Sequence, residues 1–171
     1  MGTEIERKFI IDDPQKALYA VWGVTTEVEE PYLDRCILQS YINDNVRVRV
    51  EVDRNRGPRQ VHYYLTIKSE RQGIERKEFT IEIEEEQGKE LLEEFKSNSV
   101  RKSRYINKYK GKVWEVDVFT ENNYGLFLAE IELEDKDEEF EFLPGIGDEV
   151  TDDERYYNSN LAKNPYKNWS K

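Results

Sequence analysis

The sequence predicts a mainly β, α+β fold in which eight antiparallel strands close into a tunnel barrel with a charged lumen and a few outer helices. Charged and apolar residues alternate along many segments, and a period of two is that of a β-strand. Short turn sequences join several neighbouring segments, which favours antiparallel pairing. For any one strand, an open sheet with one face in water would explain the alternation. Six segments carry mostly charge on their polar faces, and this favours a closed barrel.

The strands are predicted from this alternation and from the turn residues between them. At the N-terminus, Glu4, Glu6 and Lys8 fall on one face, while residues 46–50 alternate two arginines with three valines. Asparagine, aspartate and glycine mark turns near residues 43–45, 110–111 and 121–125. The predicted strands span roughly residues 3–11, 33–43, 46–53, 61–68, 74–84, 99–109, 112–120 and 126–134.

Three helices are predicted to interrupt the strands, over roughly residues 14–22, 85–95 and 151–161. Pro14 suits the first turn of a helix, with Asp12 or Asp13 as its cap. The last helix presents an apolar stripe made of Tyr156, Tyr157 and Leu161. We expect the helices to cover the apolar outer faces of the strands. For the C-terminal helix, sealing one mouth of the tunnel is the alternative to outer packing.

Composition narrows the class of partner. The chain has 171 residues, which is the size of a single domain with a substantial core. The net charge of −11 argues against nucleic acid and anionic membranes, because both are bound through basic surfaces. No apolar run approaches the length of a membrane span. We therefore expect a small-molecule partner, and either a monomer or a homodimer.

Cysteine and histidine are too scarce for several common kinds of site. Cys36 is the only cysteine, so the chain can form neither an internal disulfide nor a Cys–His metal cluster. It shares a strand face with apolar neighbours and is expected to be a packed thiol. His62 is the only histidine, and we interpret it as a surface residue rather than a catalytic base. The charged N-terminus lacks an apolar run of signal length, so a cytoplasmic location is expected.

A closed barrel would gather both signs of charge in its lumen. Its basic residues would be Lys8, Arg47, Arg49, Lys68, Lys102 and Arg104. Its acidic residues would be Glu4, Glu6, Glu78, Glu82, Glu115, Asp117, Glu130 and Glu132. Buried charges need mutual pairing or a multiply charged ligand. A polyphosphate with a divalent cation meets both needs, because arginine and lysine bind phosphate oxygens and carboxylates suit Mg²⁺ or Mn²⁺.

The charged motifs, taken in order, resemble the CYTH superfamily, the triphosphate tunnel metalloenzymes. The pattern of Glu4, Glu6 and Lys8 is similar to the N-terminal E-x-E-x-K signature of that family. On its own this signature is a weak signal in so acidic a chain. The resemblance continues, in order, through residues 46–49, 65–68, 76–79, 102–105, 114–117 and 129–132. The ordered set therefore carries the resemblance, from residue 4 to about residue 134.

The resemblance implies an eight-stranded tunnel that binds a linear triphosphate and two divalent cations. It implies metal ligation by Glu4, Glu6 and Glu132, with Glu130 and Asp117 as further candidates, and phosphate binding by the six basic residues of the lumen. The pattern is closest to bacterial enzymes that hydrolyse inorganic tripolyphosphate. In these enzymes water attacks the terminal phosphorus with the help of the metal, and Lys8 or Tyr41 is the candidate for orienting it. Glu78, Glu82 and Glu115 would support the lumen.

Other functions fit parts of the same pattern. A class IV adenylate cyclase would use the same acids, but that branch tends to carry a His-Phe pair ahead of the signature, where this chain has only Met1, Gly2 and Thr3. A thiamine triphosphatase would need a pocket for the organic group. A binding module without catalysis would need the basic residues and not the acids. A scaffold protein would show charges that pair only with one another.

Overall fold

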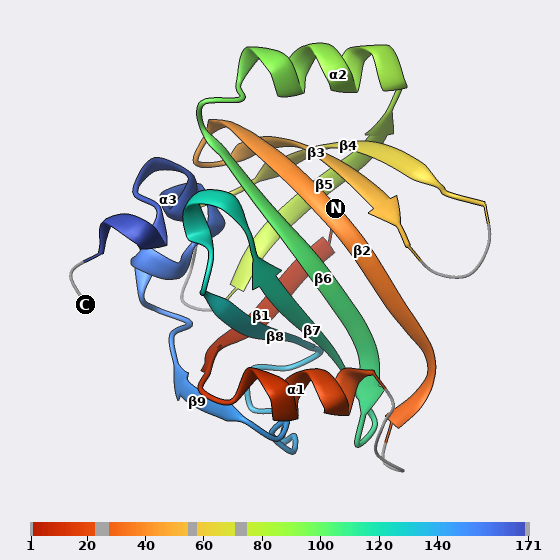
Figure 1. The fold of residues 1–171 in the computed structure, drawn as a ribbon, viewed down its shortest axis with the longest axis vertical. Helices are drawn as coiled ribbons and strands as arrows, with labels where there is room; N and C mark the ends of the chain where they lie inside the picture. The colour runs from red at the N-terminus through yellow and green to blue at the C-terminus, as the bar shows by residue number, and fades with distance from the viewer. Residues whose placement is uncertain (1, 23–27, 55–57, 71–74, 170–171) are drawn as a thin grey trace.

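The computed structural model describes residues 2–22, 28–54, 58–70 and 75–169; for residues 2–4, 28–33 and 75 it describes the backbone alone. Figure 1 shows the arrangement of its helices and strands. The strands are β1 (Gly2–Ile11), β2 (Val28–Asn43), β3 (Val46–Asp53), β4 (Val61–Lys68), β5 (Glu75–Ile83), β6 (Ser99–Tyr109), β7 (Lys112–Phe119), β8 (Phe127–Leu133) and β9 (Ile146–Glu149). The helices are α1 (Pro14–Val21), α2 (Glu85–Glu94) and α3 (Asn158–Lys163), with short 3₁₀ turns η1 (Glu121–Asn123), η2 (Glu154–Tyr156) and η3 (Tyr166–Asn168).

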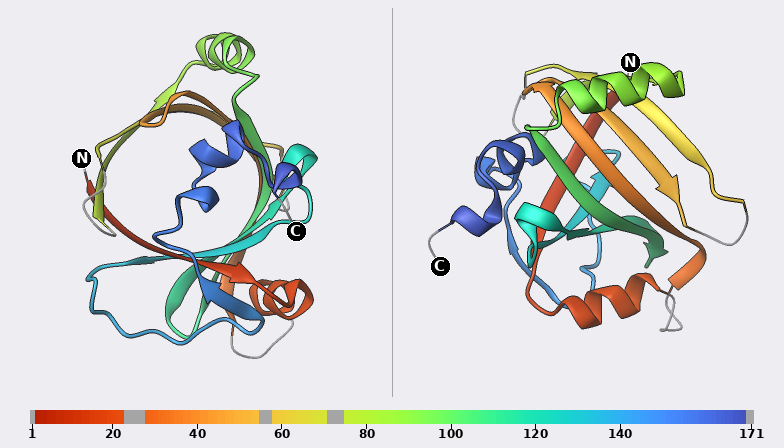
Figure 2. Two further views of the ribbon diagram at one scale, coloured as in Figure 1. Left: turned by 90° about the vertical axis from the view of Figure 1, so that its left-hand side faces the viewer. Right: turned by 45° about the horizontal axis from the view of Figure 1, so that its top comes forward.

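The strands β1 to β8 form a closed antiparallel ring. The hydrogen-bonded order runs from β5 through β4, β3, β2, β6, β7 and β8 to β1, and β1 also pairs with β5. The start of β1 pairs with β5, from Gly2 opposite Glu78, and its later residues pair with β8. Figure 2 (left) looks into this ring. The predicted eight-stranded tunnel is thus confirmed, and β9 is an added strand on the end of β1.

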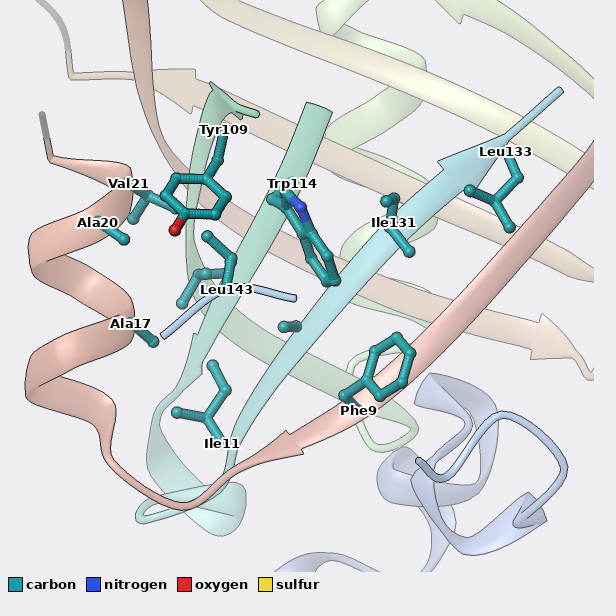
Figure 3. Packing of buried hydrophobic residues seen from close by; sticks show 12 residues of the cluster. Phe9, Ile11, Ala17, Ala20, Val21, Tyr109, Trp114, Ile131, Leu133 and Leu143 are labelled. Carbon is teal, nitrogen blue, oxygen red and sulfur yellow. The ribbon is translucent and has the colours of Figure 1, made fainter. Parts of the chain in front are cut away.

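The main apolar core lies outside the ring, beneath α1. Phe9, Trp114 and Ile131 point outward from β1, β7 and β8, opposite in face to the charged residues beside them (Figure 3). Ala17 and Val21 of α1 pack against this cluster. The helix begins as the sequence predicts, with Pro14 in its first turn behind a cap at Asp13, whose side chain accepts a hydrogen bond from the backbone of Lys16.

A second apolar cluster closes one end of the tunnel. Val100, Phe119 and Leu128 are on the lumen face of their strands, and Leu161 of α3 packs fully buried against them. Figure 2 (left) shows α3 inside the outline of the ring. The expected outer packing of the C-terminal helix is therefore wrong, and the alternative, that it seals a mouth, is confirmed. The reason is that the lumen faces become apolar at this end of the strands.

Smaller differences from the sequence expectation concern boundaries. β2 begins at Val28, five residues before the predicted start, and β9 was not predicted. The C-terminal segment forms η2 and α3 instead of one helix over residues 151–161. α2 crosses the outside of the ring over β2, β3 and β4, as expected for an outer helix. None of the described helices is long and apolar enough to cross a membrane.

Candidate active site in the tunnel

The lumen contains a cavity of about 550 Å³ lined mainly by charged side chains. Because successive side chains on a strand alternate faces, the same alternation that turns Phe9 outward turns Glu6 and Lys8 inward. The charged residues from the strands that line the cavity are Glu6, Lys8, Arg47, Arg49, Lys68, Arg76, Glu78, Arg104, Lys112, Glu115, Glu130 and Glu132. They divide into two walls of opposite character.

One side of the tunnel, which we call the acidic wall, consists of Glu6, Glu115, Glu130 and Glu132 on the neighbouring strands β1, β7 and β8. Glu6 lies directly opposite Glu132, and Glu115 lies directly opposite Glu130. Side chains directly opposite on antiparallel strands have Cβ atoms about 4.5–5.5 Å apart, and like charges there destabilise the pair. The acidic wall therefore gathers negative charge that favours a cation.

Part of this charge is balanced by Lys8 and Arg104. The Nζ atom of Lys8 lies 2.8 Å from Glu130 and 3.6 Å from Glu6. Arg104 donates to Glu130 at 2.5 Å and to both oxygens of Asp117 at 2.7 Å. Burial alone would raise the pKa of Glu130, but Lys8 and Arg104 outweigh it and hold this pKa well below its usual range. Lys8 therefore also reaches Glu6, whereas Glu132 forms no ion pair with the described residues.

The pKa of Glu115 is shifted in the opposite direction to that of Glu130. Burial, reinforced by the negative charges of Glu130 and Asp117, raises the pKa of Glu115 to about 7, although Arg104 contacts its carboxylate. The same guanidinium is shared by three acids, so it cannot compensate each of them fully. The crowding of acids on this wall thus raises the pKa of Glu115.

The opposite side, which we call the basic wall, consists of Arg47, Arg49, Lys68 and Arg76 on the neighbouring strands β3, β4 and β5. Glu78 is the acid among them, and its carboxylate lies 2.5 Å from the Nζ atom of Lys68. Burial would raise the pKa of Glu78, but Lys68 and Arg47 outweigh it and lower this pKa to about 2. One acid among four basic residues leaves this wall with an excess of positive charge.

The pKa of Arg49 reflects this excess of positive charge. Burial, together with the charge of Arg47, lowers the pKa of the Arg49 guanidinium to about 10. Its Nε atom is buried, lies 3.0 Å from a carboxylate oxygen of Glu51, and makes no hydrogen bond with the described residues. The ion pair with Glu51 uses the Nε edge of the guanidinium, and Arg49 also lines the cavity, where a phosphate oxygen can accept a charge-assisted hydrogen bond from it. Arg49 is therefore oriented for an anion in the lumen.

Tyr41 of β2 lines the cavity directly opposite Arg47 of β3. Its hydroxyl accepts a hydrogen bond of 2.9 Å from the Nε2 atom of Gln39, whose Oε1 atom accepts from Arg47 at 3.4 Å. Burial raises the pKa of Tyr41, so its hydroxyl keeps its proton at neutral pH. Tyr41 can thus donate a hydrogen bond into the cavity, but it is a poor base.

The structure brings most of the predicted site residues to one cavity. Those that line it are Glu6, Lys8, Tyr41, Arg47, Arg49, Lys68, Glu78, Arg104, Glu115, Glu130 and Glu132. Glu4 lies in β1 opposite Arg76 of β5, but its side chain is outside the described residues.

Three predicted residues take other places. Lys102 and Asp117 are almost fully buried as an ion pair and are not among the residues that line the cavity. Burial lowers the pKa of Lys102, and the charge of Arg104 adds to this effect. Glu82 is exposed, its carboxylate lies 2.7 Å from the Nδ1 atom of His62, and it too is absent from the cavity lining. His62 is thus a partly exposed residue paired with an acid outside the cavity.

Among the residues that line the cavity, sequence reasoning missed Arg76 and the C-terminal segment around Asn158. Arg76 lines it from β5 and donates to Asn45 at 2.6 Å, and its position two residues before Glu78 would have placed it on the lumen face. Tyr157, Asn158 and Ser159 line the plugged end. The signal for them was the change from charged to apolar residues along each lumen face, because an apolar tunnel end must be covered.

The acidic wall is chemically suited to a divalent cation. Glu6 and Glu132 offer oxygen ligands, which suit Mg²⁺ and Mn²⁺. Among the described side chains, no three acids are gathered closely enough to ligate one ion together. Glu130 is instead engaged by Lys8 and Arg104, and Glu4 falls outside the described side chains. The directly opposed carboxylates of Glu6 and Glu132 fit a cation placed between them.

Comparison with known sequences yields two results. The profile of the CYTH domain matches residues 2–163. A protein of Acetivibrio thermocellus named inorganic triphosphatase is 42% identical over 171 residues, with 99% of each chain covered. Another protein with that name, from Nitrosomonas europaea, is 34% identical over 164 residues, with 94% of this chain and 97% of the relative covered.

Comparison with solved structures gives the same picture. The crystal structure of an inorganic triphosphatase superimposes with a TM-score of 0.59 at 30% identity, covering 95% of each chain. A protein of Pyrococcus horikoshii shares the fold with a TM-score of 0.51 at 20% identity, covering 78% of this chain and 79% of that one.

Proposed function

The chain belongs to the CYTH domain family, and from this premise we propose that it hydrolyses the terminal phosphate of a linear triphosphate in a reaction that depends on a divalent metal. Inorganic tripolyphosphate is the proposed substrate, because both relatives with high coverage are named inorganic triphosphatase. The single observation that supports this most is the pairing of an acidic wall and a basic wall across one cavity.

The basic wall is proposed to bind the phosphates. Arg47 and Arg49 can each offer a forked guanidinium to phosphate oxygens, and Lys68 supplies a compact charge. Arg76 is a further candidate that the sequence had not indicated. Lys8 and Arg104 reach the cavity from the acidic side, so they are placed to contact phosphate while still paired with Glu130. Lys102 contributes indirectly, by holding Asp117 beside Arg104.

The acidic wall is proposed to hold Mg²⁺ or Mn²⁺, in a site for two ions. Glu6 and Glu132 are the first ligands, and Glu4 joins them because it shares the strand face of Glu6. Glu130 is the further candidate, whereas Asp117 is screened from the cavity by its two basic partners. When bound, the metal would neutralise charge on the phosphates and favour deprotonation of water.

The proposed reaction is a direct hydrolysis. The oxygen of a water molecule forms a bond to the terminal phosphorus, and the bond from that phosphorus to the bridging oxygen breaks. One orthophosphate and one pyrophosphate result, and the proton of the water passes to solvent or to a phosphate oxygen. Tyr41 is proposed to orient the water or a phosphate oxygen as a hydrogen-bond donor, since burial keeps its hydroxyl protonated.

The test is product analysis by phosphorus NMR. Purified protein is incubated with tripolyphosphate, ATP or thiamine triphosphate, each with Mg²⁺, with Mn²⁺ or with EDTA. The proposal expects equal amounts of orthophosphate and pyrophosphate from tripolyphosphate, only with metal, and slower reaction of the two organic triphosphates.

Other outcomes would replace the proposal. Cyclic AMP and pyrophosphate from ATP would assign a nucleotidyl cyclase. Preferred turnover of thiamine triphosphate would assign the organic substrate. Tight binding of tripolyphosphate that stays intact with every metal would assign a binding module.

A further inference from the structure

The lumen of the barrel is closed to solvent at one end. Along β7, the lumen positions run from Phe119 through Asp117, both buried, to Glu115, whose side chain is 31% exposed. Along the neighbouring strand β8, they run from the buried Leu128 to the exposed Glu132. Because alternate residues of a strand share a face, each series follows one line through the tunnel. The apolar end of both lines is the plugged end, and we call the acidic, exposed end the open end.

The C-terminal segment forms the barrier at the plugged end. Leu161 of α3 is fully buried in the apolar cluster there, and Asn158 and Ser159 line the cavity. Lys163, the last residue of α3, forms an ion pair with Asp44 in the turn between β2 and β3. The helix therefore lies inside the outline of the ring and is attached to the barrel wall (Figure 2, left). A chain of phosphates that reaches Asn158 and Ser159 can extend no further.

Two buried donors of the cavity lie beside this barrier. Lys8 precedes by two residues Ile10, which packs against the apolar cluster of the plugged end. Tyr41 follows by two residues Gln39, which pairs with Val100 of the same cluster. Both Lys8 and Tyr41 line the cavity and are at most 6% exposed. The deepest part of the cavity thus offers an ammonium group and a hydroxyl.

The C-terminal segment adds polar groups at the same place. Ser159 contributes a hydroxyl to the cavity lining. The Oδ1 atom of Asn158 is buried and makes no hydrogen bond with the described residues, and an amide turned about its last bond presents its nitrogen as a donor instead. A terminal phosphate has one more non-bridging oxygen than an inner phosphate, and more negative charge. It can therefore use more of these donors than an inner phosphate can.

We propose that the substrate enters with a free phosphate end first and stops against Asn158 and Ser159, so that its terminal phosphate is held at the plugged end. Everything attached to the other end of the phosphate chain then lies at the open end. This inference rests on the proposed function for the chemistry and specifies which compounds the site accepts. They are linear polyphosphates, and monoesters of such chains, with at least one free end. Cyclic phosphates and chains esterified at both ends are excluded.

Each turnover then shortens a chain by its terminal phosphate. A water oxygen forms a bond to the terminal phosphorus, the bond from this phosphorus to the bridging oxygen breaks, and one proton passes to solvent or to a phosphate oxygen. Tetrapolyphosphate therefore yields orthophosphate and tripolyphosphate, whereas cleavage at its centre would yield pyrophosphate alone.

Calorimetry in EDTA tests the need for a free end without turnover. ATP has a free phosphate end, whereas both ends of diadenosine triphosphate are esterified. ADP is the control for charge, because it has a free end and, when fully ionised, the same charge as diadenosine triphosphate. We expect diadenosine triphosphate to bind at least about tenfold more weakly than ATP and ADP. Equal binding of ADP and diadenosine triphosphate would overturn the inference.

Phosphorus NMR of tetrapolyphosphate with Mg²⁺ tests which phosphate reacts. The expected first products are equal amounts of orthophosphate and tripolyphosphate, with pyrophosphate appearing only after tripolyphosphate has accumulated. Pyrophosphate as the first product would contradict the inference, and so would cleavage of tripolyphosphate with tetrapolyphosphate left intact. If tripolyphosphate itself is not hydrolysed, the proposed function is wrong, and the binding of ADP and diadenosine triphosphate without metal still decides the inference.

Ser159→Asp tests the contact at the plugged end. It places a carboxylate where the terminal phosphate is proposed to lie, so the affinity for tripolyphosphate in EDTA should fall at least about tenfold. Ser159→Asn is the control for size without charge. Thr80→Asp adds the same charge on the lumen face of β5, at an exposed residue that is not among those lining the cavity, and should cost at most about threefold. Circular dichroism checks that the variants fold. Equal losses in Ser159→Asp and Thr80→Asp, or no loss in either, would overturn the placement of the terminal phosphate.

Discussion

Both walls of the tunnel hold side chains of like charge close together, acids on one wall and basic residues on the other. On the acidic wall, carboxylates face one another across β1, β7 and β8, and Glu115 responds with a pKa raised to about 7. On the basic wall, guanidinium groups crowd together on β3, and Arg49 responds with a pKa lowered to about 10. Each wall thus contains one residue whose charge is disfavoured by burial and by neighbours of like charge. A cation at the acidic wall and an anion at the basic wall would relieve both.

The difference also separates two roles. The acidic wall is proposed to hold metal and the basic wall to hold phosphate, so changes on one wall should affect one ligand more than the other.

Glu6→Gln should abolish most of the metal-dependent turnover. Glu6 lies opposite Glu132 in the proposed metal site, and an amide is a weaker ligand for a hard cation than a carboxylate. We expect the rate of phosphate release from tripolyphosphate to fall at least about 100-fold, measured over a range of Mg²⁺ and Mn²⁺ concentrations. The control is Glu93→Gln on the outer helix α2. Full activity with unchanged metal dependence would remove Glu6 from the metal site.

Arg49→Ala should weaken the binding of tripolyphosphate. Arg49 lines the cavity on the basic wall, and a charge-assisted hydrogen bond to phosphate would be lost. A loss of about 1.5–3 kcal/mol corresponds to roughly a 10- to 100-fold rise in KM. Steady-state kinetics measure it, with Arg54→Ala as the control at an exposed pair with Asp34. An unchanged KM would place the phosphates elsewhere.

Glu78→Gln should lower the stability of the ligand-free protein. Glu78 is the acid on the basic wall, and its pKa falls from 4.5 to about 2 on folding. A depressed pKa of an acid stabilises the fold at pH values above 4.5, and the contribution is lost as the pH falls to about 2. We expect the variant to lose about 1–3 kcal/mol at pH 7 in urea unfolding. The deficit should shrink on acidification, and a deficit that does not change with pH would refute the electrostatic explanation.

Glu115→Gln should raise the stability of the ligand-free protein, the reverse of Glu78→Gln, and by a smaller amount. The pKa of Glu115 rises from 4.5 to about 7 on folding, so the folded state favours the protonated form. The penalty for its charge is absent below pH 4.5, grows between pH 4.5 and 7, and is complete above pH 7. The variant should therefore melt at a higher temperature than wild type at pH 8 and at the same temperature near pH 4. Destabilisation at pH 8 would contradict this explanation. It would show that losing the ion pair between Arg104 and Glu115 costs more free energy than removing the repulsion among the acids restores.

The sequence predicts the walls well because strand alternation is a local property. Arg47 and Glu130 each sit between outward apolar neighbours, Lys8 is followed by the outward Phe9, and closure of the ring turns all three charged residues inward. The expected eight strands and the inward set of charges follow from this pattern and from the family resemblance together.

Two features depend on contacts between residues that are distant in the chain, and the sequence pattern does not reveal them. They are the closure of the tunnel end by the C-terminal segment and the ion pair of Lys102 with Asp117. Leu161 lies 61 residues after Val100 and 33 residues after Leu128 in the chain, and no local period shows that it meets them. The pairing of Lys102 with Asp117, which removes both from the cavity wall, depends on the register of β6 and β7. Register of this kind is set by the closed ring, and a single strand does not contain it.

The most direct test of the two-wall account is the binding of tripolyphosphate measured by calorimetry in EDTA, where the basic wall acts alone. The account predicts that Glu6→Gln binds at least as tightly as wild type, because a negative charge has been removed from the opposite wall. It predicts that Arg49→Ala binds more weakly under the same conditions. Equal losses of affinity in both variants would contradict it, because metal and phosphate would then share both walls.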